Sequence, residues 1–254
     1  MMIDVAQYIR DTNAAGTVDT AFSHLEGALA KLGFDRIVYS LITDHPRLRK
    51  KRQHGIVRNY PEDWMSHYFS RGYVDVDPVI SVIKQRAGAF AWEQLERVGG
   101  RPLSNKETVL MHEAREARLL DGIGISFHNP TGEIVGMGVA SSSGKTECSR
   151  NTISLIQLLC TQFNQVFQDI ETESTAHEQL VTLSRREREI LTWLAVGKSR
   201  SVTADIVGIS EHTVKTYLQR VFAKLGTCTT QEAVVRAIRL GLIAPDISRG
   251  RNLL

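Results

Sequence analysis

The sequence predicts an α+β protein of two domains: an N-terminal α/β/α sandwich on a mostly antiparallel sheet, and a C-terminal all-α domain of four helices containing a helix-turn-helix. Three observations lead to this prediction. Helical and strand-like hydrophobic patterns alternate through residues 1–168, a polar acidic stretch occupies residues 169–182, and residues 183–254 hold short helical patterns with clear ends. We therefore expect a first domain in 1–168, a linker in 169–182 and a second domain in 183–254.

Composition agrees with a folded protein. The chain has 254 residues, of which 42% are hydrophobic and 23% charged, which suits two domains of ordinary size. No apolar run reaches the roughly 18 residues that a membrane helix needs, and residues 1–13 lack the apolar core of a secretory signal. Because Cys148, Cys160 and Cys228 are scattered, we expect a cytoplasmic protein without membrane, metal site, disulfide framework or cofactor.

The first domain shows alternating elements. Helices are expected in residues 18–32, closed by Gly33, in 61–71, from Pro78 onward, and in 104–120 behind a capping box of Ser104 and Glu107. The β-branched and aromatic residues 34–43 predict a strand, and residues 123–128 and 134–140 predict a hairpin. Residues 150–167 form a long helix with apolar side chains on more than one face, which indicates burial on two sides or self-association.

The second domain carries consistent local signals. Ser184 with Glu187, and Thr229 with Glu232, are capping boxes that open the first and fourth helices. Ser199 and Ser210 are the expected caps of the second and third helices, and Gly197, Gly208, Gly226 and Gly241 are the expected stops. The tight connection between Gly208 and Ser210 predicts the turn of a helix-turn-helix.

Charge points to a polyanionic partner for this domain. From residue 183 onward the chain has twelve Lys and Arg against six Asp and Glu, a net charge of +6, while the rest carries −3. On the third helix, Val214, Leu218 and Val221 would pack inward. The candidate DNA contacts are the polar residues away from that stripe and in the preceding loop: Lys198, Ser199, Thr213, Lys215, Thr216, Gln219, Arg220 and Lys224. The alternative is a plain helical bundle with a solvated polar face.

These residues also carry a family resemblance. The runs LSRREREILTWLAVGKS, GISEHTVKTYLQRVFAKLG and QEAVVRAIRLGLI resemble the DNA-binding domain of LuxR-type regulators over residues 183–243. This sequence departs from the family at residues 201–203, where Ser-Val-Thr replaces the usual Glu-Ile-Ala, and at Tyr217, usually histidine. The resemblance implies a transcription factor that binds a double-stranded DNA operator as a homodimer, with RNA polymerase as a further candidate partner.

A second resemblance covers residues 37–140. The residues Tyr60, Trp64, Tyr68, Asp77 and Trp92 resemble the autoinducer-binding domain of quorum-sensing LuxR-type regulators, whose ligands are N-acyl homoserine lactones. The resemblance implies that Trp64 donates to the lactone carbonyl, Tyr60 to the acyl carbonyl, and Asp77 accepts from the ligand amide. It implies packing roles for Tyr68 and Trp92, and places Gly138 where the family commonly has Ser or Thr.

Other interpretations remain open at this point. The aromatic residues are core residues in one alternative, and Asp77 is then only the cap of the helix that begins at Pro78. The departures at Met65, Arg118 and Gly138 leave room for a ligand without a 3-oxo group, another ligand, or a ligand-independent regulator with a vestigial pocket. An enzyme is disfavoured, because the sequence has no Ser/His/Asp or Cys/His ordering and no paired-carboxylate motif, so no catalytic residue is expected.

Overall fold

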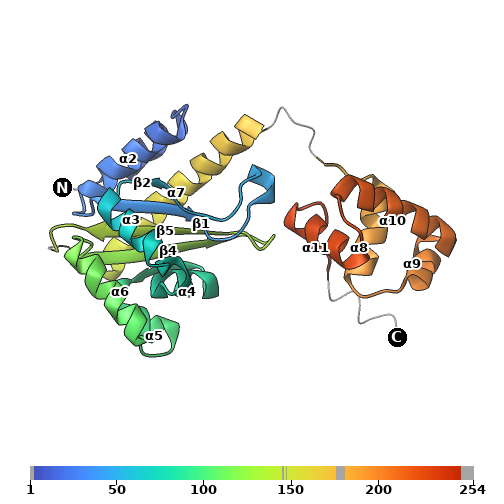
Figure 1. Cartoon of the computed structure of the whole chain (residues 1–254). Helices are drawn as coiled ribbons and strands as arrows, with labels where there is room; N and C mark the ends of the chain where they lie inside the picture. The colour runs from blue at the N-terminus through green and yellow to red at the C-terminus, as the bar shows by residue number, and fades with distance from the viewer. Residues whose placement is uncertain (1–2, 145, 147, 176–180, 247–254) are drawn as a thin grey trace. The chain divides into compact units, whose positions relative to one another are not determined.

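The computed structural model describes residues 3–144, 146, 148–175 and 181–246. It divides into two compact units, Met1–Thr175 and Ala176–Leu254, each described here by itself (Figure 1). Residues 176–180 of the expected linker and residues 247–254 of the expected second domain lie outside the described residues. No helix among the described residues is both long and apolar enough to span a bilayer.

An antiparallel sheet of five strands forms the centre of the first unit. The strand order is β2-β1-β5-β4-β3, and every neighbouring pair is antiparallel. The strands are β1 (Arg36–Leu41), β2 (Gln53–Arg58), β3 (Gly88–Ala91), β4 (Asp121–His128) and β5 (Ile134–Ser141). The predicted hairpin is present as β4 and β5, with Ile125 opposite Met137. Strands β2 and β3 are additions that the sequence patterns did not predict.

Helices cover both faces of this sheet, so the predicted sandwich is confirmed (Figure 1). One face carries α1 (Val5–Asn13), α2 (Val18–Ala30) and α7 (Arg150–Thr175), which pack on one another. The other carries α3 (Glu62–Ser70), α4 (Pro78–Gln85), α5 (Leu95–Gly99) and α6 (Asn105–Glu116). Three short 3-10 helices complete the unit: η1 (Pro46–Leu48), η2 (Tyr73–Asp75) and η3 (Trp92–Gln94).

Strand β1 separates two groups of side chains by its alternation. Ile37, Tyr39 and Leu41 belong to the core beneath α2 and α7, whereas Val38 and Ser40 face the opposite layer. The Tyr39 ring packs against two phenylalanines of α7, and its hydroxyl donates to Asn164 at 2.9 Å. This alternation follows from the two-residue period of a strand.

Helix α7 extends beyond the boundary expected from the sequence. Residues 169–175, expected as linker, continue the helix to Thr175. Polar contacts within the helix support this last part, since Gln165 donates to Asp169 and the Thr172 hydroxyl donates to the Gln168 carbonyl. Lys50 also lies 3.0 Å from Glu171, which ties the helix to the segment before β2. Acidic composition alone did not reveal these contacts.

The apolar side chains of α7 are mostly buried on two sides. Ile156, Leu159 and Phe163 are fully buried, because α7 packs both on the sheet and on α1 and α2. Leu158 stays 46% exposed. The sequence left open whether the apolar side chains of this helix are buried on two sides or used in self-association. Burial on two sides accounts for most of them.

The second unit has the predicted helices: α8 (Arg185–Ala195), α9 (Arg200–Val207), α10 (Glu211–Leu225) and α11 (Thr230–Arg239). Both predicted capping boxes are formed, with Ser184 and Glu187 on α8 and Thr229 and Glu232 on α11. Gly208 and Gly226 end α9 and α10 in the left-handed conformation, which a residue without Cβ adopts easily. Apolar residues from all four of these helices form one core.

Candidate ligand cavity and nucleic-acid interface

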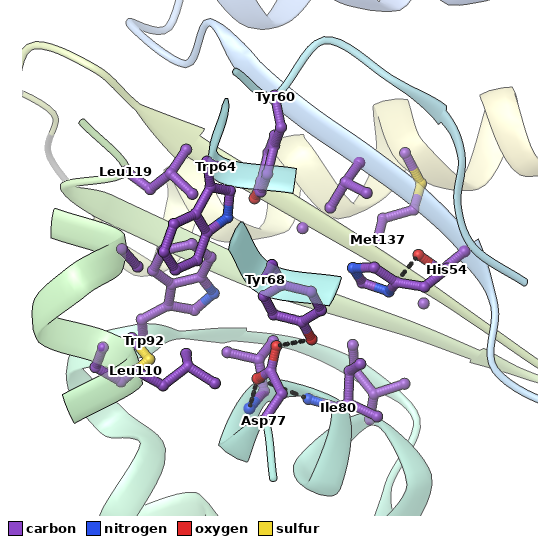
Figure 2. A pocket seen from close by; sticks show the side chains of 18 of the residues that line it. His54, Tyr60, Trp64, Tyr68, Asp77, Ile80, Trp92, Leu110, Leu119 and Met137 are labelled. Carbon is purple, nitrogen blue, oxygen red and sulfur yellow. Dashed lines mark hydrogen bonds between the residues drawn. The ribbon is translucent and has the colours of Figure 1, made fainter. Parts of the chain in front are cut away.

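A cavity lies in the first unit between the sheet and the layer of α3, α4 and α6. The cavity is narrow, with a volume of about 50 Å³. All six candidate ligand contacts named in the sequence line it: Tyr60, Trp64, Tyr68, Asp77, Trp92 and Gly138. Figure 2 labels the first five. The six residues come from four separate places in the fold, so their convergence in one cavity is a result of the tertiary structure.

Helix α3 supplies most of the aromatic wall. Tyr60 comes just before the helix, and Trp64 and Tyr68 follow at intervals of four residues, so all three side chains project from one side. Each is buried, with the Trp64 and Tyr68 rings 5.9 Å apart. Figure 2 shows Trp64 and Trp92 on one side of the cavity and His54 on the other, with Tyr68 between them.

Glycines in the sheet make room for these rings. A Cβ at Gly122 would lie 2.1 Å from the Trp92 ring, so only glycine permits that indole to rest on the strand. A Cβ at Gly138 would lie 2.9 Å from the Tyr60 hydroxyl and 2.9 Å from a methyl of Val38. The sequence predicts only that Gly138 lacks the hydroxyl common at this position in the resembling family. The structure assigns it a different role, because Tyr60 occupies that space.

Asp77 both caps a helix and faces the cavity. Its Oδ1 accepts from the backbone N–H of Val79 at 2.7 Å and of Ile80 at 3.4 Å, which is the N-cap of α4. Its Oδ2 accepts from the Tyr68 hydroxyl at 2.7 Å. Burial raises the pKa of Asp77 and these hydrogen bonds only partly oppose that rise. A carboxylate offers about four lone-pair sites, so one remains for a further donor.

Two buried donors in the cavity wall have no partner among the described residues. The Tyr60 hydroxyl and the Trp92 indole Nε1 are both shielded from solvent and make no hydrogen bond within the described chain. Burial and the nearby Asp77 charge raise the pKa of Tyr60, so its hydroxyl keeps its proton. A buried donor without a partner costs free energy, so both groups are suited to meet acceptors on a bound molecule.

Sequence reasoning missed two polar residues in the wall. His54 and Ser40 line the cavity, with Ser40 Oγ 3.0 Å from His54 Nδ1. Ser40 lies between two apolar cavity residues, Val38 and Ile42, so its hydroxyl was an available signal. His54 had no such signal because β2 was not predicted and its face was unknown.

The remaining wall is largely apolar. Helix α6 contributes Leu110, Met111 and Ala114, and helix α4 contributes Val79, Ile80 and Ile83. Met65 and Arg118, the two other positions at which the sequence departs from the family, do not belong to the polar part of the wall. Met65 is buried beside Gly55, and Arg118 has a φ of 62°, the left-handed region in which glycine is usual.

Among the described residues, no group of three or more His, Cys, Asp and Glu is arranged to hold a metal ion. The three cysteines are free thiols. Of these, Cys160 lies fully buried in the core beneath α7, and burial raises its pKa.

The second unit presents a polar face on α10. Lys215, Gln219 and Arg220 are exposed, and Lys215, Thr216 and Gln219 share one side of the helix with His212. The Arg220 guanidinium lies over the Tyr217 ring, 5.6 Å from its centre. Thr213 bonds to the cap residue Ser210, and Ser199 caps α9, so both side chains already have a structural partner. Lys198 lies in the loop between α8 and α9.

Lys224 differs from the other candidate DNA contacts. Its ammonium lies 2.7 Å from Oε2 of Glu187, whose side chain is only 4% exposed. The same Oε2 accepts from the Ser184 backbone N–H. Burial raises the pKa of Glu187, but the bonds from Lys224 and Ser184 outweigh burial and hold it low. Lys224 therefore joins α10 to α8, a role that the helical pattern alone did not indicate.

Two buried hydroxyls of the same unit, those of Thr203 and Thr227, have no partner among the described residues. Thr203 is fully buried on α9. It is one of the positions at which this sequence departs from the resembling family.

Comparison with known proteins covers both units. Residues 17–167 match the model described as "Autoinducer binding domain", and residues 181–237 match "Bacterial regulatory proteins, luxR family". The chain is 31% identical to the quorum-sensing regulator RhlR of Pseudomonas aeruginosa over 233 residues, covering 87% of this chain and 89% of that protein. It is 29% identical to the putative HTH-type transcriptional regulator y4qH of Sinorhizobium fredii over 244 residues, covering 95% and 74%.

A solved structure has the same fold. The crystal structure of Escherichia coli SdiA superposes with a TM-score of 0.74 at 22% identity, covering 95% of this chain and all of that one.

Proposed function

The chain belongs to the luxR family of bacterial regulatory proteins and carries an autoinducer-binding domain. We propose that an N-acyl homoserine lactone, bound in the cavity of the first unit, controls the protein. The observation that carries this proposal is the set of unused polar groups there. Tyr60 and Trp92 offer buried donors without partners, and Asp77 keeps one acceptor site. An N-acyl homoserine lactone has two carbonyl oxygens and one amide N–H, which complement that set.

The contacts follow from this complementarity. Tyr60 donates to the acyl carbonyl, Trp64 to the lactone carbonyl, and Asp77 accepts from the amide N–H. Trp92 adds a second indole N–H on the side where Trp64 lies (Figure 2). The apolar side chains of α4 and α6 receive the acyl chain, where each buried methylene contributes about 0.8 kcal/mol.

Calorimetric titration of the full-length protein with N-octanoyl homoserine lactone tests this proposal. We expect saturable binding, weakened about three- to tenfold by Tyr60→Phe, which removes one hydroxyl and keeps the ring. Leu158→Ala, outside the cavity, is the control and should leave affinity unchanged. If the wild type binds none of a panel of acyl homoserine lactones, the rival proposal of a ligand-independent regulator is favoured.

The second unit is proposed to bind duplex DNA through α10. Lys215, Thr216, Gln219 and Arg220 form its exposed polar side, while Lys224 acts structurally through Glu187. We expect Lys215→Ala and Arg220→Ala to weaken binding to an operator selected from random duplexes, and to lower the salt slope by about one each. Arg186→Ala removes the same charge from α8 and should have little effect. Equal operator binding by all three variants would show that α10 is not the recognition helix.

We propose that the protein acts as a homodimer, because helix-turn-helix modules commonly read paired half-sites. Sedimentation at micromolar concentration, with ligand and operator present, should give the mass of two chains. A monomer under those conditions would contradict the proposal. RNA polymerase stays a candidate partner from the family resemblance.

A further inference from the structure

His54 holds a second polar position in the cavity, across Tyr68 from the tryptophans. Its ring stacks on the Tyr68 ring at 5.0 Å with an angle of 16° between the planes. The Tyr68 hydroxyl, at the end of the same ring, donates to Asp77. His54 is therefore one aromatic ring away from the carboxylate that is proposed to hold the ligand amide.

The hydrogen bonds of Ser40 determine which ring nitrogen of His54 carries the proton. Ser40 Oγ accepts from the Gly55 backbone N–H at 3.0 Å and lies 3.0 Å from His54 Nδ1. Ser40 is 2% exposed, so its own proton needs an acceptor within the protein. Nδ1 is the acceptor available, which leaves the proton of the neutral imidazole on Nε2.

Nε2 is thus a donor that no described residue engages. Figure 2 shows His54 bonded through one ring nitrogen, while the other ring nitrogen faces the interior of the cavity. Burial, with a smaller contribution from Arg58, lowers the pKa of His54 to about 4, so the ring is neutral near pH 7. An apolar chain passing this N–H would leave it without a partner, whereas an oxygen on the chain would satisfy it.

We infer that His54, oriented by Ser40, selects a ligand whose acyl chain carries a hydroxyl or carbonyl oxygen near the amide. This inference rests on the proposed function, because it takes Asp77 as the amide contact. It differs from the interpretation that Gly138 leaves room for a ligand without a 3-oxo group, because His54 offers the acyl oxygen a donor elsewhere in the cavity.

Matched ligands test the inference with the full-length protein. The probes are N-octanoyl, N-(3-oxooctanoyl) and N-(3-hydroxyoctanoyl) homoserine lactone. We expect the wild type to bind at least one oxygenated ligand about three- to tenfold more tightly than the plain one. His54→Leu keeps the bulk and loses the donor, so it should bind the plain ligand most tightly. His54→Gln retains an N–H and should keep part of the wild-type preference.

Ser40→Ala separates positioning from direct contact. Ser40 is a positioning residue here, so its loss should lower the affinity for the oxygenated ligands more than that for the plain ligand, and should reduce the preference less than His54→Leu does. A merely structural role would instead lower the affinity for all three ligands equally. Plain-ligand binding by His54→Leu also shows that this variant is folded.

The outcomes are distinct. Tight wild-type binding of all three ligands without discrimination, or an order unchanged in His54→Leu, overturns the inference and leaves the proposed function standing. Wild-type binding of none of the three overturns both.

Discussion

The Tyr68 hydroxyl donates to Oδ2 of Asp77 at 2.7 Å, and the other oxygen of that carboxylate caps α4. One side chain therefore fixes the end of α4, holds an aromatic residue of α3, and faces the cavity. The two sequence interpretations of Asp77, helix cap and cavity residue, are compatible in this geometry. Structural and binding roles must be separated by substitution.

Asp77→Asn is expected to reduce ligand affinity about ten- to a hundredfold, because the charge-assisted acceptor for the amide is lost. The free energy of unfolding should change little, since asparagine caps a helix as well as aspartate does. Ligand titration and thermal unfolding of the same preparation measure both quantities. Unchanged affinity in a variant that is normally stable would remove Asp77 from the ligand contacts and leave it a cap.

Gly138→Ser is expected to weaken binding of every acyl homoserine lactone, including 3-oxo ligands, because its Cβ would push against the Tyr60 hydroxyl and Val38. Gly138→Ala brings the same Cβ without a hydroxyl and should behave alike. Isothermal titration with plain and 3-oxo ligands measures the effect. A selective gain for the 3-oxo ligand in Gly138→Ser alone would contradict this expectation and would indicate that a hydroxyl at this position contacts the 3-oxo group.

Lys224→Met is expected to destabilise the second unit by about 1 to 3 kcal/mol, since it leaves the buried Glu187 carboxylate without its cation. Lys224 is partly exposed, which keeps the figure below that of a fully buried pair. Hydrogen exchange of the α8 and α10 amides in the full chain reports this change. Glu187→Gln combined with Lys224→Met should recover most of the loss, and equal protection in the wild type and the single variant would contradict the pairing.

Thr203→Val is expected to stabilise the second unit by about 1 kcal/mol, because it removes a buried hydroxyl without a partner and keeps the shape of the side chain. Hydrogen exchange of the α9 amides in the full chain measures the change. Thr203→Ser keeps the hydroxyl and loses a methyl group, so it should not stabilise. A destabilised Thr203→Val variant would mean that the hydroxyl has a bonding role.

The pH dependence of stability provides a test for the burial of His54. Its pKa is about 4 when folded and 6.5 in the ordinary state, so between these values the unfolded chain binds the proton more readily. Stability is unaffected above pH 6.5 and falls as the pH drops toward 4, by at most about 3 kcal/mol from this residue. Denaturant unfolding at several pH values should show this loss in the wild type and a smaller loss in His54→Gln. Parallel pH profiles would indicate a solvated His54.

The second unit was predicted almost completely because its signals are local. Ser184 with Glu187, and Thr229 with Glu232, lie within one turn of each other, so the sequence shows both partners together. The contact of Glu187 with Lys224 joins residues far apart in the chain, and periodicity could not reveal it.

The first unit was less predictable where tertiary contacts decide the structure. Strands β2 and β3 are short edge strands, stabilised by pairing with β1 and β4 rather than by a pattern of their own. The cavity residues Tyr60, Trp64 and Asp77 came from the family resemblance, and the structure brings them together. His54 and the true end of α7 depended on partners elsewhere in the chain, which one sequence does not identify.

The alternation of β1 has an evolutionary consequence. Val38 and Ser40 contact the cavity, while their neighbours Ile37, Tyr39 and Leu41 hold the core. Substitutions at Val38 and Ser40 can therefore change which ligand is bound, while Ile37, Tyr39 and Leu41 continue to stabilise the core. An insertion or deletion of one residue would exchange the two sets. Descendants of this chain can thus diversify their signals through single substitutions in this strand, but not through changes in its length.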